Sequence, residues 1–235
     1  MNLGILQCDS IREEFVAQYG QYPAMIAALL HTSDPSIEFS VFNVKQGELP
    51  NHVDAADAYI ITGSRDGVND GHNWIEQLEQ FVRDLYHARK KVIGICFGHQ
   101  IIAKAMGGQV IKSPKGWGLG MSQNTLLVDK SWMNPKQSEL NILVSHQDQV
   151  VELPEGAEVL AGSEFCPYYM LQLDSFLTIQ GHPEFTKDYA KALIITREDH
   201  VSKIHFTKAM DSLSLNVHDA LIAQWIVAFL SHQES

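Results

Sequence analysis

The stretch of residues 91–106 constrains the fold more than any other part of the chain. An apolar run suited to a β-strand, Val92–Ile95, leads directly into Cys96, which has one glycine two positions before it and another two positions after it. Apolar residues at helical spacing follow, at Ile101, Ile102, Ala105 and Met106. Because glycine allows a sharp turn, the pattern predicts a strand, a tight turn with a thiol at its apex, and a helix.

A thiol at such a turn is a candidate nucleophile. The N-terminus of the following helix would point at the sulfur, and its partial positive charge favours the thiolate over the thiol. The backbone N–H groups of the turn can also face an oxyanion. A free cysteine at the end of a strand is, however, often a buried structural residue. The turn alone therefore leaves both a catalytic and a structural role open for Cys96.

The chain has the length and composition of a globular protein. Its 235 residues suit one large domain or at most two small ones, and 45% of them are hydrophobic while 19% are charged. The sequence shows no linker, internal repeat or low-complexity segment. We therefore expect a single domain over residues 1–235, with a helical C-terminal segment over about residues 190–235.

The charge and cysteine content narrow the choice of partner and compartment. The net charge is -11, and the longest basic run is only residues 89–91, so neither nucleic acid nor an anionic membrane is an expected partner. The N-terminus reads as a core strand and not as a signal peptide, and no apolar run is long enough to span a membrane. Three widely spaced cysteines argue against a disulfide framework. A cytoplasmic location is the expectation.

The order of the predicted elements indicates an α/β fold. Strands alternate with helices from the N-terminus, so we expect a mixed, mainly parallel central sheet with flanking helices. Shorter alternating strands near residues 161–164, 170–173 and 176–180 suggest an antiparallel portion, and residues 187–206 and 218–232 look helical. The glycine-rich residues 115–120 suggest a hairpin beside the cleft, in which Trp117 serves packing.

A polar loop follows the predicted strand at residues 58–61. In open α/β sheets, ligands bind at the carboxyl ends of strands. A glycine there lets a backbone N–H approach a substrate oxygen, which makes Gly63 and Ser64 candidate oxyanion donors. The alternative is an ordinary turn.

A second candidate loop supplies a base for the thiol. His182 lies at the end of a predicted strand, its backbone is expected to be extended because Pro183 follows, and Glu184 is two positions further on. Side chains two apart on an extended chain project to one side, so Glu184 can orient the imidazole while its other nitrogen faces the sulfur. A His-Pro turn on the surface is the plain alternative.

Two other histidines have less specific roles, and the sequence carries no metal or cofactor motif. His99 is expected to be buried and hydrogen-bonded, and His146 fits a substrate pocket or a structural role equally well. No His-x-x-x-His or Cys-x-x-Cys spacing, phosphate loop or dinucleotide fingerprint occurs, so no metal or cofactor is predicted.

Three motifs together resemble those of the class I (triad) glutamine amidotransferases. They are Gly-Ile-Cys-Phe-Gly-His-Gln at 94–100, Ser-His-Gln-Asp-Gln-Val at 145–150 and Gln-Gly-His-Pro-Glu-Phe at 180–185. The chain looks most similar to the stand-alone members that resemble GMP synthase amidotransferase domains and plant γ-glutamyl peptidases. The resemblance implies a flavodoxin-like α/β fold.

The resemblance also implies roles for individual residues. Cys96 would attack the side-chain amide of glutamine to give a γ-glutamyl thioester and ammonia. His182 would transfer the protons, and Glu184 would orient the His182 imidazole. The backbone N–H groups of Phe97 and of the Gly63–Ser64 turn would hold the oxyanion. Three further residues match positions that hold the amino-acid head of the substrate: Gln100, Ser145 and His146.

Two departures from the family pattern leave the substrate open. Many members have Gly-Gly-Pro where this chain has Gly-Ser-Arg at residues 63–65, and 235 residues leave no room for a synthetase domain. Either a synthetase partner accepts the ammonia, or the chain is a γ-glutamyl peptidase acting on glutathione-like conjugates. A non-catalytic regulatory module that kept the fold is the third alternative.

Overall fold

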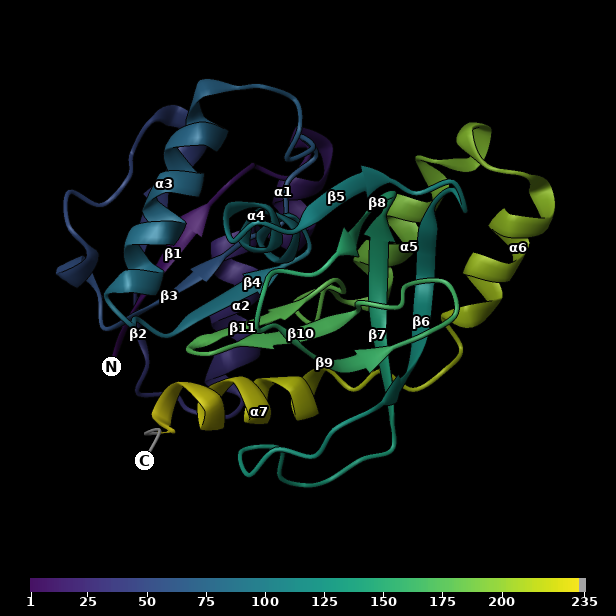
Figure 1. Cartoon of the computed structure of the whole chain (residues 1–235). Coiled ribbons are helices and arrows are strands. Elements are labelled where there is room, and N and C mark those ends of the chain that lie inside the picture. Colours follow the sequence, from purple (N-terminus) through teal and green to yellow (C-terminus); the bar gives the residue numbers. More distant parts are fainter. Residues whose placement is uncertain (233–235) are drawn as a thin grey trace.

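A nine-stranded mixed sheet forms the centre of the computed structural model, which describes residues 1–232 (Figure 1). The strand order is β2-β1-β3-β4-β11-β10-β9-β6-β7. The first five strands in this order are parallel: β2 (Glu38–Asn43), β1 (Asn2–Gln7), β3 (Ala58–Ile61), β4 (Val92–Ile95) and β11 (Phe176–Ile179). The other four pair antiparallel: β10 (Met170–Leu173), β9 (Glu158–Gly162), β6 (Gly118–Leu126) and β7 (Glu139–His146). The predicted mixed, mainly parallel sheet is confirmed.

Helices cover both faces of the parallel half. Successive side chains of a strand point to opposite faces, so Ile93 and Ile95 pack with α2 (Tyr22–His31) and α7 (Asp219–Ser231). Val92 packs on the other face, with α3 (Asn73–His87) and α4 (Phe97–Ala105). Burial on both faces explains why the parallel strands are continuous apolar runs.

The antiparallel half carries the remaining helices. Helices α5 (Lys187–Ile195) and α6 (Lys203–Ser212) pack against β6 and β7, and each begins at a hydroxyl N-cap, Thr186 and Ser202. The continuous helix expected over 187–206 is wrong, because α5 ends at Ile195 and a short 3₁₀ turn, η3 (Glu198–His200), separates it from α6. Of the helical segment expected over 190–235, residues 233–235 lie outside the described residues.

Two further sequence expectations need correction. The connector before α2 contains a short helix, α1 (Glu13–Tyr19), and two 3₁₀ turns follow later, η1 (Val44–Gln46) and η2 (Val53–Ala55). The hairpin expected at 115–120 is absent from the described chain, because β6 begins at Gly118 and pairs with β7, while β5 (Gln109–Lys112) pairs with β8 (Asp148–Glu152) in a separate two-stranded sheet.

Gly120, one of the glycines on which the hairpin prediction rested, has a packing role. Gly120 has φ +82°, and a Cβ placed there would lie 2.6 Å from the carbonyl oxygen of Ala209 in α6. Glycine therefore lets the strand pass directly against the helix.

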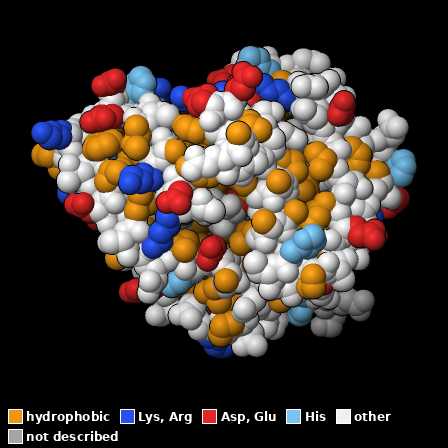
Figure 2. Space-filling view, turned by 180° about the vertical axis from the view of Figure 1, so that it is seen from behind, with side chains coloured by type: hydrophobic (Ala, Val, Ile, Leu, Met, Phe, Trp, Pro, Cys, Tyr) orange, Lys and Arg blue, Asp and Glu red, His pale blue; other side chains and the backbone are white. Residues whose placement is uncertain are grey.

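None of the described helices is long and apolar enough to cross a membrane. On the face shown in Figure 2, Lys and Arg side chains lie close to Asp and Glu side chains, with hydrophobic side chains in patches between them.

Candidate active site

The turn between β4 and α4 presents Cys96 at the carboxyl edge of the sheet. Cys96 has φ 52° and ψ −99°, a backbone conformation that L-residues rarely adopt, and it occupies the N-cap position of α4. The flanking glycines permit this turn: a Cβ on Gly94 would lie 2.7 Å from the carbonyl oxygen of Gly98, and one on Gly98 would lie 2.4 Å from that of Ile61. The predicted strand–turn–helix unit is therefore present, with the thiol at its apex.

The partner loop reaches Cys96 because β11 lies next to β4 in the sheet. The Cys96 N–H donates to the carbonyl of Ile179, the last residue of β11, at 2.9 Å. Three residues later, the His182 N–H donates to the carbonyl of Leu143 in β7 at 2.8 Å. The sheet topology thus brings together two loops that are far apart in the sequence.

His182 and Glu184 form a buried hydrogen-bonded pair. His182 Nδ1 lies 2.7 Å from Glu184 Oε1, and the two side chains are only 4% and 0% exposed. The expectation that the chain stays extended from His182 to Glu184 is wrong: the Phe185 N–H donates to the His182 carbonyl at 3.3 Å, so the chain turns at Pro183 and Glu184. The Phe185 ring stacks on the imidazole at 3.9 Å between centroids and fixes its plane.

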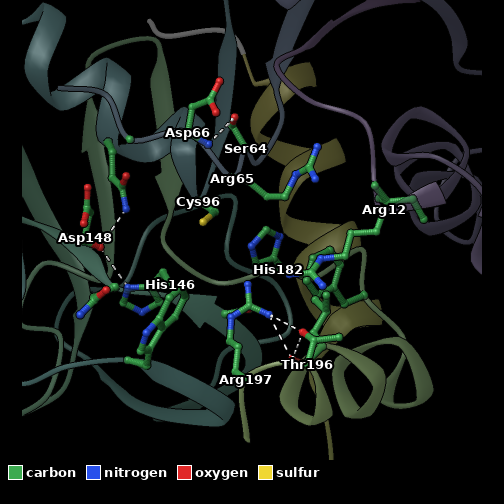
Figure 3. A pocket seen from close by; sticks show the side chains of 18 of the residues that line it. Arg12, Ser64, Arg65, Asp66, Cys96, His146, Asp148, His182, Thr196 and Arg197 are labelled. Carbon is green, nitrogen blue, oxygen red and sulfur yellow. Dashed lines mark hydrogen bonds between the residues drawn. The ribbon is translucent and has the colours of Figure 1, made fainter. Parts of the chain in front are cut away.

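The surroundings of His182 favour its protonated form. Burial alone would lower its pKa, but the Glu184 carboxylate and then Cys96, within hydrogen-bonding reach, raise the pKa of His182 to about 10. Figure 3 shows the imidazole beside the Cys96 sulfur. A protonated imidazole at this position can donate a proton to a departing group.

The loop after β3 lies over the same imidazole. A Cβ on Gly63 would lie 2.8 Å from His182 Cε1, and Ser64 lies on the wall of the cavity in front of Cys96. Phe97 is the first residue of α4, where backbone N–H groups lack helical acceptors. Of the three backbone positions named from the sequence, Gly63 thus lies against His182, Ser64 lines the cavity and Phe97 directly follows Cys96, and their oxyanion role stays a prediction.

A cavity of about 630 Å³ opens in front of Cys96 and His182. The three residues expected to hold the substrate head, Gln100, Ser145 and His146, all line it. Two of them also organise the wall: Gln100 Nε2 donates to the Asp148 carbonyl at 2.8 Å, and His146 Nδ1 lies 3.0 Å from the same oxygen. Burial lowers the pKa of His146 to about 4, so this ring is neutral near pH 7.

His99 does not line this cavity. Its side chain is fully buried, and Nδ1 lies 2.8 Å from Thr178 Oγ1. Burial, followed by the nearby His146, lowers the pKa of His99 to about 3. The predicted buried, hydrogen-bonded histidine is confirmed.

The far wall of the cavity comes from segments that the sequence did not single out. It includes Tyr22, Tyr189 and, from segments outside the regular helices, Arg12 and Arg197. Trp117 also lines this wall, with the Arg197 guanidinium 4.6 Å from its ring centroid, so the expectation of packing alone was too narrow. No motif marks these positions, because they meet only through the fold.

One acidic group lies at the rim of the cavity. Asp66, Asp70 and His72 could approach a common ion, but Asp70 and His72 are exposed and Asp66 pairs with Lys45 at 2.7 Å. The group resembles ordinary surface acidic residues.

Cys96 lies on a strained strand–helix turn beside a buried His–Glu pair, at the carboxyl edge of a mixed sheet. These features place the chain among the α/β proteins that carry a candidate thiol nucleophile. The chain belongs to the class I glutamine amidotransferase family, whose sequence profile matches residues 17–199.

Curated relatives extend over most of the chain. γ-Glutamyl peptidase 3 of Arabidopsis thaliana is 36% identical over 79% of this chain and 77% of its own length. A glutamine amidotransferase-like protein of Schizosaccharomyces pombe is 32% identical over 82% and 83%. The glutamine-hydrolysing GMP synthase of Streptococcus mutans is 27% identical over 86% of this chain, but over only 39% of its own length.

Solved structures agree on the fold. A glutamine amidotransferase from Thermotoga maritima superposes with a TM-score of 0.70 at 15% identity, covering 97% of this chain and 95% of that one. One from Methylobacillus flagellatus gives a TM-score of 0.73 at 19% identity, covering 100% and 96%.

Proposed function

We propose that this chain hydrolyses a γ-glutamyl C–N bond through a thioester on Cys96. The observation that carries the proposal is the placement of Cys96 on a strained elbow, within hydrogen-bonding reach of an imidazole that Glu184 holds at 2.7 Å. That arrangement supplies a nucleophile, a proton carrier and an orienting group in one buried site.

The first half of the reaction forms the thioester. The Cys96 thiolate attacks the γ-carbonyl carbon, and backbone N–H groups of Phe97 and the Gly63–Ser64 turn stabilise the oxyanion. The C–N bond breaks as His182 donates its proton to the departing nitrogen. Glu184 stabilises the imidazolium before that transfer.

The second half releases glutamate. His182, now neutral, takes a proton from water as the water attacks the thioester carbon. The C–S bond breaks, the sulfur departs as thiolate, and the imidazolium–thiolate pair is restored. One water is consumed for each amine released.

The size of the cavity favours a leaving group larger than ammonia. Sites of about 300–1,000 Å³ hold ligands of drug size, and the cavity of about 630 Å³ continues beyond His182 toward α5. Relatives named γ-glutamyl peptidases cover most of the chain. We therefore propose γ-glutamyl peptides or conjugates as substrates, with Gln100, Ser145 and His146 near the glutamyl head.

Glutamine is the second candidate substrate, with the ammonia passing to a synthetase partner. The match to part of a GMP synthase supports it. We also propose that residues 1–235 form one domain. The buried free thiols of Cys8, Cys96 and Cys166 fit a cytoplasmic location.

The test is release of amine or ammonia from γ-glutamyl-alanine and glutamine. The purified chain should release alanine, Cys96→Ala should release none, and Cys166→Ala should retain activity, because Cys166 is a buried thiol outside the cavity lining. The second candidate would be favoured if the chain released no alanine from γ-glutamyl-alanine, and released ammonia from glutamine only when a synthetase was present. Turnover by Cys96→Ala would reject both.

A further inference from the structure

Carboxylates and two of the arginines lie on different sides of the cavity, which Lys112 also lines. Figure 3 shows Asp66 and Asp148 on one side of the Cys96 sulfur, and Arg12 and Arg197 on the other side, with His182 between. The scissile bond must lie at Cys96. One end of the cavity therefore receives the glutamyl head, and the other receives the leaving amine.

The side of the cavity with Asp148 suits the glutamyl head, whereas Asp66 already pairs with Lys45 at 2.7 Å. The head carries an ammonium group, which needs carboxylate or carbonyl acceptors, and its α-carboxylate sits on the same carbon. Asp148, Gln100 and Ser145 meet at this end. The cationic end is then left for the leaving amine.

Of the arginines around the cavity, Arg65 already has a carboxylate partner. Its Nε and its terminal nitrogen donate to the two oxygens of Asp9 at 2.8 and 3.0 Å, and the Asp9 carboxylate is nearly fully buried. This two-point ion pair occupies the guanidinium.

Arg197 has no such partner. Its guanidinium donates to the Leu193 carbonyl at 3.1 Å and to Thr196 Oγ1 at 3.4 Å, and it lies over the Trp117 ring. Within residues 1–232, no carboxylate lies within ion-pair distance of it. Burial, and then the positive charge of Arg12, lower the pKa of Arg197, while Tyr22, Tyr189 and Cys96 raise it by less.

Arg12 is only weakly neutralised. Among residues 1–232 its ion pair is with Glu14 at 3.8 Å. The two side chains are 39% and 58% exposed, and such exposed pairs contribute little to stability. Two cations with this little compensation, at one end of a cavity, create a site for an anion. An anion bound between them would remove their repulsion.

Building on the proposed function, we propose that Arg197, assisted by Arg12, binds a free carboxylate on the leaving-amine part of the substrate. The substrate class is then a γ-glutamyl peptide with a free C-terminal carboxylate. A γ-glutamyl amine and glutamine lack this carboxylate on the leaving group. Arg197 is a specificity residue that contacts the part of the substrate beyond the scissile bond, and Trp117 holds its guanidinium in place.

Matched acid and amide substrates test the assignment. The four compounds are γ-glutamyl-alanine, γ-glutamyl-alanyl-glycine and the C-terminal amide of each. For at least one pair, wild type should show a kcat/KM about 10–100-fold higher for the acid, the range expected of a charge-assisted hydrogen bond. Arg197→Met should remove that preference by slowing the acid alone. Arg83→Met, on the exposed side of α3, is the matched control and should keep it.

Several results would overturn the assignment. Equal kcat/KM for both acids and their amides in wild type would do so, and this comparison does not depend on the folding of any variant. An equal loss on acid and amide in Arg197→Met would place Arg197 at the glutamyl head, and a preference that survives in Arg197→Met would exclude the residue. In each of these cases Cys96-dependent turnover would persist, so the proposed function would stand. Failure of wild type to hydrolyse any of the four would instead reject the proposed hydrolysis of γ-glutamyl peptides, on which this assignment rests.

Discussion

His182 Nδ1 lies 2.7 Å from Glu184 Oε1, and both side chains are almost fully buried. The contact uses one ring nitrogen and leaves the other for Cys96. A carboxylate so close to the ring also favours the imidazolium, since opposite charges stabilise each other most where water is excluded.

Replacing Glu184 by Gln should shift the pH dependence of kcat/KM. His182 must be protonated to release the amine, and its pKa is raised to about 10, so wild-type activity should fall only as the pH rises toward 10. Glu184→Gln removes the charge, so this alkaline limb should move to lower pH, with a loss of roughly 10–100-fold near neutrality. An alkaline limb that stays in place would show that Glu184 does not set the pKa of His182.

The same pair should make stability depend on alkaline pH. Because the folded pKa of His182 lies above its ordinary value of 6.5, the stabilisation is complete below about pH 6.5 and is lost as the pH rises to about 10. Urea denaturation of wild type across this range should show the decline, and His182→Gln should flatten it. If the free energy of unfolding fell equally with pH in wild type and in His182→Gln, the ion pair between His182 and Glu184 would be contradicted.

Acid should destabilise the fold through two buried neutral histidines. Burial lowers the pKa of His99 to about 3 and that of His146 to about 4, so each contributes stability above about pH 6.5 that is lost as the pH falls. Each contributes a slope of up to about 1.4 kcal/mol per pH unit below pH 6.5. In urea titrations, His146→Gln should lower the slope between pH 6.5 and 4.5, while the exposed His52→Gln should not. An unchanged slope in His146→Gln would mean that His146 is not held neutral.

Gly63→Ala should impair turnover more than folding. The new Cβ would lie 2.8 Å from His182 Cε1, so the imidazole must move. A displacement of about 1 Å can cost on the order of 100-fold in rate, whereas a small shift at the cavity wall should change the melting temperature little. Steady-state kinetics and thermal melting measured together make the comparison. Wild-type kcat with a lowered melting temperature would be the opposite of the expected result.

Gly120→Ala should loosen α6 from the sheet. The added Cβ would lie 2.3 Å from Ser212 Oγ and 2.6 Å from the Ala209 carbonyl oxygen. The matched control is Gly116→Ala, which has a similar φ of +80° and open space around it, so it carries backbone strain alone. Urea denaturation should show Gly120→Ala less stable than the control by about 1–3 kcal/mol. Equal stabilities would mean that α6 does not rest on Gly120.

The sequence predicted those parts of the molecule that depend on local pattern. The elbow at Cys96 follows from glycine spacing, and the alternating strands and helices follow from apolar runs. The pairing of His182 with Glu184 was expected for the wrong reason, because a turn and not an extended chain brings the two together. Trp117 was assigned to packing because its contact with Arg197 depends on the fold and leaves no local pattern in the sequence.

The far end of the cavity could not be predicted. Arg12 lies in the connector after β1, and Arg197 follows α5, yet both line the cavity with Cys96. For Arg197, the placement of α5 beside β6 and β7 brings it there. Such positions depend on tertiary packing, which leaves no local periodicity in the chain.

The central claim is that Cys96 carries out nucleophilic cleavage of a γ-glutamyl C–N bond. Its most direct test is intact mass measurement of the protein during turnover of γ-glutamyl-alanyl-glycine, after rapid acid quenching. A γ-glutamyl adduct on Cys96 should form as alanyl-glycine is released and decay as water releases glutamate, and it should be missing from Cys96→Ala. Peptide release at the wild-type rate by Cys96→Ala would contradict it.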